Sequence, residues 1–221
     1  MKALMYPVYG DPVDFENISS LVPDISVIAH ALALQNRWHG NTKYYWSVAN
    51  HCIHAVEIFK HSFEFFNVKE FSPAYRYIML RLFLHDAGEA YTGDINTYIK
   101  HASPEISEIC DAVQAHVENH FVPLVTDFSN TLGIYYSDVD HIVHTVDKLC
   151  GWAEVHAIAN EKCPLYNFVE DVLPDWVLND ALLRLWNIIT DCDTPAYSEI
   201  RYKTMFSGLN RAVIDAVEDK R

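Results

Sequence analysis

Three Ser-Pro or Thr-Pro pairs each precede a stretch with apolar residues at helical spacing. The pairs are Ser72-Pro73, Ser103-Pro104 and Thr194-Pro195. A hydroxyl side chain is favoured at the residue that caps a helix, and proline is favoured at the first helical position. Because two independent preferences coincide at each pair, the sequence predicts that helices begin at residues 73, 104 and 195.

Other capping residues predict four further helices, each with its own apolar periodicity. They are Asp24, Ser47, Ser137 and the pair Pro174-Asp175. The stretch 73–92 is expected to form one continuous helix, and residues 6–15, around the sequence YGDP, a small β-hairpin or an irregular turn. The sequence therefore predicts an all-α array of about seven helices with almost no strand.

The composition predicts one domain without a membrane anchor. Half of the 221 residues are hydrophobic, which is enough to bury one sizeable core. We expect a single domain over residues 1–221, in which a motif-bearing core (18–160) packs against C-terminal helices (174–217). No apolar run is long enough to cross a membrane, and the N-terminal segment lacks the apolar centre of a secretory signal. Five scattered cysteines without a CxxC pair indicate reduced thiols, so we expect a cytoplasmic protein.

The formal net charge of −14 argues against binding to a nucleic-acid polymer. Such polymers are bound mainly through Lys and Arg side chains that neutralise phosphates, and this chain has 16 of them against 30 acidic residues. A small phosphorylated ligand is not excluded, because it needs only a local positive site and a metal ion can supply that charge.

The sequence LFLHDAGEAYTGD at residues 82–94 places ionisable side chains directly after an apolar run. Burying an ionised carboxylate costs several kcal/mol unless the group is paired or bound to a metal. Glu89 follows Asp86 by three residues and His85 by four, so on a helix the three side chains would share one side. Two interpretations follow: an exposed helix end, or a group of side chains with a common partner.

Two more residues of this kind interrupt apolar helical patterns elsewhere. His51 lies in SVANHCIHAVEIF, and Asp147 lies in DHIVHTVDKLCGWAEVHA. Helices from distant parts of a chain can converge in a bundle, and imidazoles with carboxylates suit magnesium or a divalent first-row transition metal. Spacing alone leaves rivals, because His54 lies near His51, and both Asp140 and His144 lie near Asp147.

The ordered set His51, His85-Asp86 and Asp147 resembles the HD-domain phosphohydrolases. Longer motifs extend the match. The segments HALALQNRWHG, SVANH, and LHDAGEAYTGDI followed by Lys100 are similar to those of a small branch of these enzymes, which includes bacterial 5′-deoxynucleotidases and phage dATP triphosphohydrolases. The resemblance covers residues 18–160 and implies an HD-domain helical fold.

This resemblance implies one bound divalent metal ion, drawn from Co, Mn, Zn and Mg. The expected ligands are His51, His85, Asp86 and Asp147. Asp147 is preferred to Asp140 because Glu154 follows Asp147 by seven residues, which resembles the family pattern. Asp140 is instead expected in the first turn of its helix, where a carboxylate favours the helix dipole.

Asp86 and Glu89 are the expected catalytic residues. Glu89 resembles the family's catalytic acid, which positions or deprotonates the attacking water. Its alternative role is that of a partner to a metal-binding His. The metal ion lowers the pKa of its bound water and polarises the phosphoryl oxygen.

Four further residues are expected to contact substrate: Arg37, Trp38, Asp94 and Lys100. The planar fork of Arg37 suits a phosphate, although a salt bridge would also explain this residue. Lys100 is a second phosphate contact or a solvated lysine, and Trp38 stacks on a base or packs in the fold. Asp94 contacts the ribose or orients a ligand, or it caps a helix. Relatives often have His at the position of Asn41, so this chain is expected to hold phosphate differently if that His takes part.

The resemblance implies a metal-dependent hydrolase that cleaves the 5′ phosphoester of deoxynucleotides. We expect deoxynucleoside monophosphates as substrates, because few Lys and Arg residues lie near the motifs. The alternative is a dNTP triphosphohydrolase, notably one that converts dATP to deoxyadenosine and triphosphate. A catalytically inactive nucleotide-binding module is a remote alternative, because no ligand is missing and Glu89 is present. A di-iron or haem-binding bundle is equally remote, since paired Glu-x-x-His motifs are absent.

The resemblance also implies a homo-oligomer, a dimer or larger. The aromatic-rich C-terminal helices could supply either core or a self-association face, and we expect each of their large apolar residues to lie in the core. These residues are Trp176, Leu183, Trp186 and Phe206.

Overall fold

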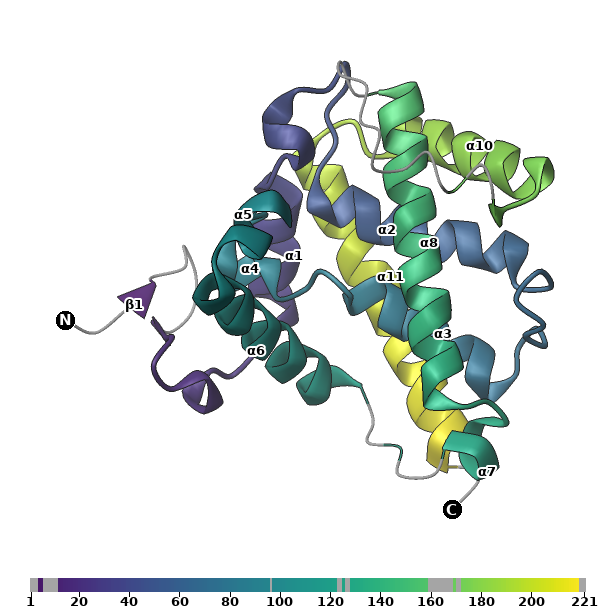
Figure 1. The fold of residues 1–221 in the computed structure, drawn as a ribbon, viewed down its shortest axis with the longest axis horizontal. Coiled ribbons are helices and arrows are strands. Elements are labelled where there is room, and N and C mark those ends of the chain that lie inside the picture. The colour runs from purple at the N-terminus through teal and green to yellow at the C-terminus, as the bar shows by residue number, and fades with distance from the viewer. Residues whose placement is uncertain are drawn as a thin grey trace.

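The computed structural model describes residues 4–5, 12–95, 97–122, 125, 128–158, 169 and 172–218. This part of the chain is almost entirely helical (Figure 1). Its α-helices are α1 (Ile25–Leu34), α2 (Val48–Ser62), α3 (Pro73–Leu84), α4 (Glu89–Thr92), α5 (Thr97–Ala102), α6 (Pro104–Phe121), α7 (Phe128–Leu132), α8 (Tyr136–Ala157), α10 (Asp175–Asp191) and α11 (Pro195–Glu218). Two short 3-10 segments are η1 (Ile18–Ser20) and η2 (Arg37–Gly40). The predicted all-α fold class is confirmed.

The predicted caps stabilise the long helices. In the first turns of α1, α2, α3 and α6, backbone N–H groups donate hydrogen bonds to the side chains of the capping residues. These residues are Asp24, Ser47, Ser72 and Ser103. The start of α8 differs from the prediction, because the helix begins at Tyr136, before the expected cap at Ser137. The Tyr136 ring packs edge-on against Phe128, with 5.2 Å between ring centroids, and this contact supports an earlier first turn.

Two short strands lie near the N-terminus. β1 (Leu4–Met5) pairs antiparallel with β2 (Val13–Asp14), with Leu4 opposite Asp14 and Met5 opposite Val13. β2 lies within the predicted hairpin (residues 6–15), whereas β1 precedes it. Residues 6–11 of that prediction lie outside the described residues.

The predicted single helix over residues 73–92 is wrong at its centre, because α3 ends at Leu84 and α4 begins at Glu89. A continuous helix would join the Gly88 N–H group to the Leu84 carbonyl. Instead, the Gln114 side chain of α6 binds both groups: Gly88 N donates to Gln114 Oε1 (2.6 Å), and Gln114 Nε2 donates to Leu84 O (2.8 Å). A side chain inserted into the helical hydrogen-bond ladder in this way breaks the helix.

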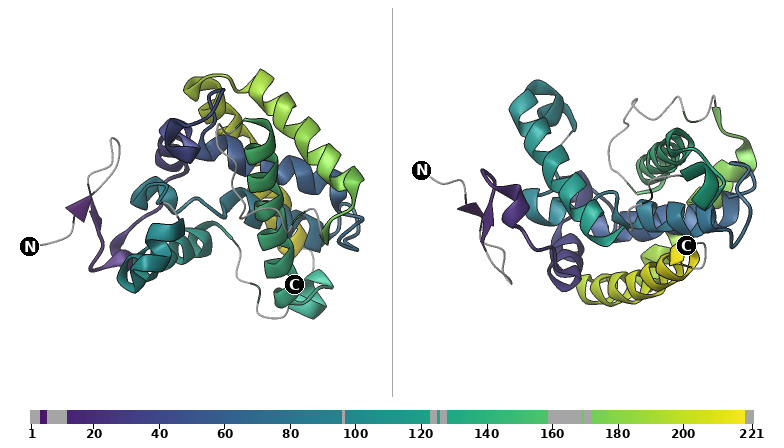
Figure 2. Two further views of the ribbon diagram at one scale, coloured as in Figure 1. Left: turned by 45° about the horizontal axis from the view of Figure 1, so that its top comes forward. Right: turned by 90° about the horizontal axis from the view of Figure 1, so that it is seen from below.

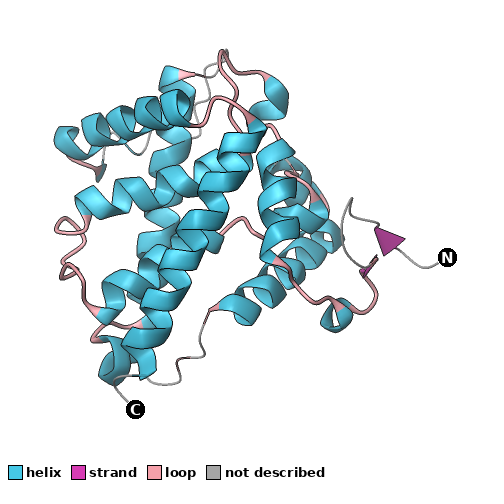
Figure 3. Cartoon of the chain, turned by 180° about the vertical axis from the view of Figure 1, so that it is seen from behind, coloured by secondary structure: helices cyan, strands magenta, loops and turns pink. Residues whose placement is uncertain are grey.

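Helix α2 lies at the centre of the array and contacts α1, α3, α8, α10 and α11. Helix α11 packs along one side of α2 and α3, while α8 and α10 cover the other side (Figure 2, right). Seen from behind, α11 runs across the face that it covers (Figure 3). Helices α4, α5 and α6 lie beside α1, away from α10 (Figure 1).

The central position of α2 explains why most of its 15 residues are buried, polar ones included. Buried polar groups need hydrogen-bond partners. The Asn50 side chain has two: its Nδ2 donates to Cys192 O (3.3 Å), and Ser198 Oγ donates to its Oδ1 (2.6 Å). The same helix brings the imidazoles of His51 and His54 into the interior.

The buried apolar cluster includes residues from Val13 to Val213. Of the four C-terminal residues expected in it, Phe206 is buried, whereas three residues of α10 are exposed: Trp176 (50%), Leu183 (52%) and Trp186 (41%). Helix α10 packs on α2 and α8 through its opposite face, which carries Val177, Ala181, Leu185 and Ile188. Among the described helices, none has the length and apolarity that a membrane span requires.

Candidate metal centre

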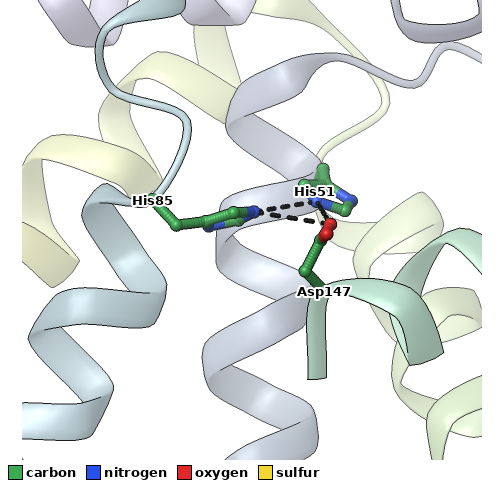
Figure 4. A group of neighbouring side chains, drawn as sticks. All are labelled: His51, His85 and Asp147. Carbon is green, nitrogen blue, oxygen red and sulfur yellow. Dashed lines mark hydrogen bonds and ion pairs between the residues drawn. The ribbon is translucent and has the colours of Figure 1, made fainter. Parts of the chain in front are cut away.

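Three parts of the fold bring His51, His85, Asp86 and Asp147 to one point. His51 comes from α2, Asp147 from α8, and His85 and Asp86 from the turn that follows α3. His51 Nε2 lies 3.1 Å from His85 Nε2 and 3.2 Å from Asp147 Oδ1 (Figure 4). Asp86 Oδ2 lies 3.6 Å from His51 Nε2 and 3.4 Å from His85 Nε2.

Hydrogen bonds at the opposite ring nitrogens fix the orientation of both imidazoles. The Nδ1 atom of His51 donates to Glu154 Oε1 (2.6 Å), and that of His85 donates to Leu82 O (2.6 Å). In the neutral rings both Nε2 atoms are then acceptors, and they face each other. Two such nitrogens at 3.1 Å repel each other unless a cation or a proton lies between them. The geometry therefore calls for a positive charge at this point.

The electrostatics of the histidines and Asp147 lead to the same conclusion. Burial by itself lowers the pKa of His85, but the Asp86 carboxylate and a hydrogen bond to Asp147 raise that pKa well above its usual value. Burial and the Arg37 cation lower the pKa of His51, and its carboxylate partners reverse this shift. Burial would raise the pKa of Asp147, yet bonds to the two histidines hold it well below the usual value. The centre favours positive charge on the imidazoles and negative charge on Asp147.

This donor set fits a divalent metal ion. The ligand atoms of His51, His85 and Asp147 all lie within 4.8 Å of one another, so one ion could contact all three. Imidazole Nε2 atoms with their Nδ1–H groups hydrogen-bonded are typical metal ligands, and the carboxylates add the negative charge that such an ion needs.

The three residues that spacing alone left as alternative ligands lie away from this centre. His54 Nε2 donates to Ala181 O (2.8 Å), on the side of α2 that faces α10. Asp140 is half-exposed and accepts a hydrogen bond from Arg81 Nη2 (3.1 Å). His144 is exposed on α8. The structure therefore places Asp147, and not Asp140, beside His51, while the role of each ligand stays a prediction.

Glu154 is a functional candidate that the sequence analysis used only as a spacing marker. It is fully buried, and besides His51 it accepts hydrogen bonds from Arg37 Nε (3.1 Å) and Trp38 Nε1 (2.9 Å). Burial would raise the pKa of Glu154, but the Arg37 and His51 partners hold it well below its usual value. The seven-residue spacing from Asp147 could have revealed it, since that spacing puts both carboxylates on one face of α8.

Arg37 and Trp38 lie in a turn with unusual backbone geometry. Trp38 (φ 57°), His39 (φ 53°) and Gly40 (φ 75°) are all in the left-handed region. Each non-glycine residue there costs about 1–2 kcal/mol, and such residues persist where surrounding contacts hold them. Here the contacts include Trp38 to Glu154, and Arg37 Nη1 to Asp86 Oδ2 (3.4 Å). Arg37 therefore forms the salt bridges that were considered as its alternative role. Its contact with phosphate stays a prediction.

Glu89 lies at the edge of the centre, with its carboxylate mostly buried. Its Oε1 lies 3.6 Å from Lys100 Nζ, and its Oε2 has no hydrogen-bond partner among the described residues. Burial raises the pKa of Glu89 well above its usual value, and the carboxylates of Asp86 and Asp94 raise it further. Arg37 and Lys100 act in the opposite direction. The structure thus brings Asp94 and Lys100 to the surroundings of Glu89.

Glu89 does not take the alternative role considered for it. The Nδ1 atoms of His51 and His85 are bonded to Glu154 and to Leu82 O, so neither imidazole uses Glu89 as its partner. A buried carboxyl group with a raised pKa and an oxygen that lacks a hydrogen-bond partner among the described residues is instead suited to accept or donate a proton.

Gln114 is a second residue that sequence reasoning missed, and it holds the turn that presents His85, Asp86 and Glu89. Helix α6 approaches this turn so closely that a Cβ atom on Gly88 would lie 2.8 Å from the Gln114 Cα. Glycine is therefore needed at position 88. Nothing in the local sequence indicates a contact between residues 26 positions apart.

A helical array in which two histidines and two aspartates converge in this order is the arrangement of the HD-domain phosphohydrolases, which are metal-dependent. A family model described as 5′-deoxynucleotidase YfbR-like matches residues 24–163, more than half of the chain. The chain belongs to this family. A search of curated proteins gave no match.

Proposed function

We propose that this protein is a metal-dependent hydrolase that cleaves the 5′ phosphoester of deoxynucleoside monophosphates. The observation that carries the proposal is the convergence of the His51 and His85 Nε2 atoms on Asp147 and Asp86. Membership of the deoxynucleotidase family supports the class of substrate.

In this proposal His51, His85, Asp86 and Asp147 hold one divalent ion. When bound, such an ion acidifies water and polarises a phosphoryl oxygen. Glu154 holds the His51 ring with its Nε2 atom toward the ion. The backbone carbonyl of Leu82 does the same for His85.

Glu89 handles the proton in this proposal. Burial and the neighbouring carboxylates raise the pKa of Glu89 well above its usual value, as is typical of carboxyl groups that serve as general acids or bases. Lys100, 3.6 Å from Glu89 Oε1, keeps a positive charge beside it and is suited to contact the substrate phosphate. Asp94 and the half-buried Trp38 ring are proposed to contact the deoxyribose and the base.

The pairing of the basic groups favours a monophosphate. At the site, Arg37 is bonded to Glu154 and Asp86, and Lys100 lies beside Glu89. The charge available to additional phosphates is therefore small, whereas a triphosphate needs several cations. Triphosphate release from dNTPs is the alternative, notably from dATP, and an inactive nucleotide-binding module is a remote one.

Product analysis tests the proposal. Protein supplied with Mn²⁺ or Co²⁺ should release inorganic phosphate from the four dNMPs, and EDTA should stop the reaction. Chromatography of the products from the four dNTPs gives the opposing test, since release of triphosphate at a higher rate than phosphate from dNMPs would establish the alternative.

Two matched variants test the metal ligands on one helix. Asp147→Ala should abolish both metal retention and phosphate release. Asp140→Ala should leave both unchanged, because Asp140 contacts Arg81 and not the centre. Equal metal retention in the two variants would contradict the ligand assignment. Asp86→Ala should behave as Asp147→Ala does.

We further propose a cytoplasmic, single-domain protein that self-associates. The exposed residues Trp176, Leu183 and Trp186 of α10 are the candidate contact surface. Sedimentation analysis of wild-type protein and of Leu183→Glu tests it, because the variant should shift the equilibrium toward the monomer. A wild-type protein that sediments as a monomer would exclude this assembly.

A further inference from the structure

Cys52 lies at the metal centre, one residue after His51 on α2, and its side chain is fully buried. Its Sγ atom and one ligand atom each of His85 and Asp86 all lie within 4.8 Å of one another. Among the described residues this is a second group of three potential metal ligands. Cys150 is equally buried near the same helices and belongs to neither group.

The two groups of ligands share His85, and in the proposed function the ion beside His51 also uses Asp86. The Nδ1 atom of His85 is bonded to Leu82 O, so Nε2 is the atom that His85 offers to either group. One imidazole nitrogen binds one metal ion at a time. A cation held by Cys52, His85 and Asp86 therefore excludes a cation from the position between His51, His85 and Asp147.

The two positions differ in chemical character. The position beside His51 offers imidazole nitrogen and carboxylate oxygen, which suit Mn²⁺, Co²⁺ and Mg²⁺. The position beside Cys52 adds a thiolate sulfur, which is a soft ligand and favours Zn²⁺ or Cd²⁺. Helix α2 already holds this sulfur beside two other ligand atoms, and because burial raises the pKa of the Cys52 thiol, the cation has to displace its proton.

We propose that Cys52, His85 and Asp86 form an alternative site for a thiophilic divalent cation, and that this site competes with the metal position beside His51. The proposal rests on the metal centre of the proposed function. Binding is an acid–base step: the Sγ–H bond breaks, the proton leaves to solvent, and a sulfur lone pair forms the bond to the cation. Nothing is oxidised or reduced.

Absorption spectra of the Co²⁺-loaded protein test this proposal without an activity assay. Visible d–d bands report that Co²⁺ is bound, and an intense near-ultraviolet band reports a bond from sulfur to cobalt. Because Co²⁺ binds nitrogen, oxygen and sulfur ligands, the proposal predicts that it is distributed over the two positions in different molecules, and we expect both signals in wild-type protein. In Cys52→Ser the visible bands should remain and the near-ultraviolet band should be lost, whereas Cys150→Ser should resemble the wild type.

The outcomes separate this proposal from the proposed function. Visible bands without the near-ultraviolet band in wild-type protein would overturn the role of Cys52 and leave the metal centre intact. Persistence of the near-ultraviolet band in Cys52→Ser would also overturn it. Absence of visible bands in every variant would contradict the metal centre itself, and the alternative site with it.

A competition experiment provides a second readout. Bound Mn²⁺ loses the electron paramagnetic resonance signal of the free ion, so added Cd²⁺ should release that signal from wild-type protein. The same release from Cys52→Ala should require at least about tenfold more Cd²⁺. A loss of this size is typical when a group that supports a metal site is removed. Equal Cd²⁺ requirements in Cys52→Ala, Cys150→Ala and wild type would overturn the proposal.

Discussion

His51 and His54 lie one turn apart on α2 and are both fully buried, yet their ring nitrogens meet different partners and their pKa values shift in opposite directions. His51 donates to Glu154 and faces Asp147 and Asp86, and its pKa is raised. His54 donates to the Ala181 carbonyl, and burial lowers its pKa to about 4.

Burial alone therefore does not decide the direction in which the pKa of a histidine shifts. Both rings lose hydration, which disfavours their charged forms. Carboxylates contributed by α8 and by the turn after α3 reverse that effect for His51. His54 instead meets a backbone carbonyl and the edge of the Trp46 ring (5.8 Å between centroids), and its Nδ1 atom has no hydrogen-bond partner among the described residues.

The largest expected effect comes from exchanging each histidine for glutamine. His51→Gln should lose the metal ion and reduce phosphate release to the rate of metal-stripped protein, because an amide is a poor substitute for imidazole nitrogen. His54→Gln should retain both, since its amide can still donate to Ala181 O. Metal content and phosphate release are measured on both variants, and similar metal loss in the two would refute the contrast.

The acid stability of the metal-free protein should depend on His54. The unfolded chain binds a proton at His54 below about pH 6.5, whereas the native state does so only near pH 4. The native state is therefore destabilised as the pH falls through this window, by up to about 3 kcal/mol, and the effect levels off below it. Above pH 6.5 His54 makes no pH-dependent contribution.

Urea unfolding of wild type and His54→Gln at several pH values measures this contribution. The difference between the two proteins isolates His54 from His51 and His85, whose raised pKa values act in the opposite direction in the metal-free protein. A pH dependence that is the same in both proteins would show that His54 is not kept neutral in the native state.

Glu154→Gln should weaken metal binding by about 10–100-fold, because the variant no longer fixes the His51 tautomer as firmly. Chelator competition measures the affinity. Asp180→Asn is the matched control: its carboxylate pairs with Arg184 (2.9 Å) on α10 and is not among the groups that shift the pKa of His51. An affinity of Glu154→Gln equal to that of the control would remove Glu154 from the centre.

The smallest effect is expected at the turn between α3 and α4. Gln114→Leu leaves Gly88 N without its acceptor, although Leu84 O keeps the hydrogen bond from Ala87 N (2.9 Å). The free energy of unfolding should fall by about 1–2 kcal/mol, with a modest loss of metal affinity. Val117→Ala, on the same helix, should destabilise the protein without that loss. If both variants bind metal alike, Gln114 has a purely structural role.

Much of the fold could be predicted from local signals. N-cap residues such as Ser72 and Ser103, each followed by proline, fix where helices begin, and apolar spacing predicts their length. The break at residues 85–88 could not be predicted, because it depends on Gln114, which reaches the turn only after α6 has packed against it. Local propensity contains no information about such an insertion.

The candidate site divides in the same way. Ionisable residues in apolar helices need partners, which indicates a site, but the choice of His51, His85-Asp86 and Asp147 over their neighbours came from the resemblance to the HD-domain phosphohydrolases. The spacing from Asp147 points to Glu154, but its hydrogen-bond partners could not be predicted, because only the three-dimensional fold brings them together: one histidine, one arginine and one tryptophan. The left-handed turn at Trp38 and His39 was equally hidden, because non-glycine residues rarely adopt that conformation, even though histidine does so more often than most.

The shared use of Glu154 has a thermodynamic consequence. One carboxylate orients the His51 ring toward the metal position and also holds Arg37 and Trp38 in their turn. A ligand that moves the Glu154 carboxylate through His51 must also change its hydrogen bonds to Arg37 and Trp38. The reverse holds for a ligand that acts through Arg37 or Trp38. Metal affinity and nucleotide affinity are therefore expected to be linked, and linkage is reciprocal: if nucleotide tightens the hold on the metal by some factor, the metal tightens the hold on nucleotide by the same factor.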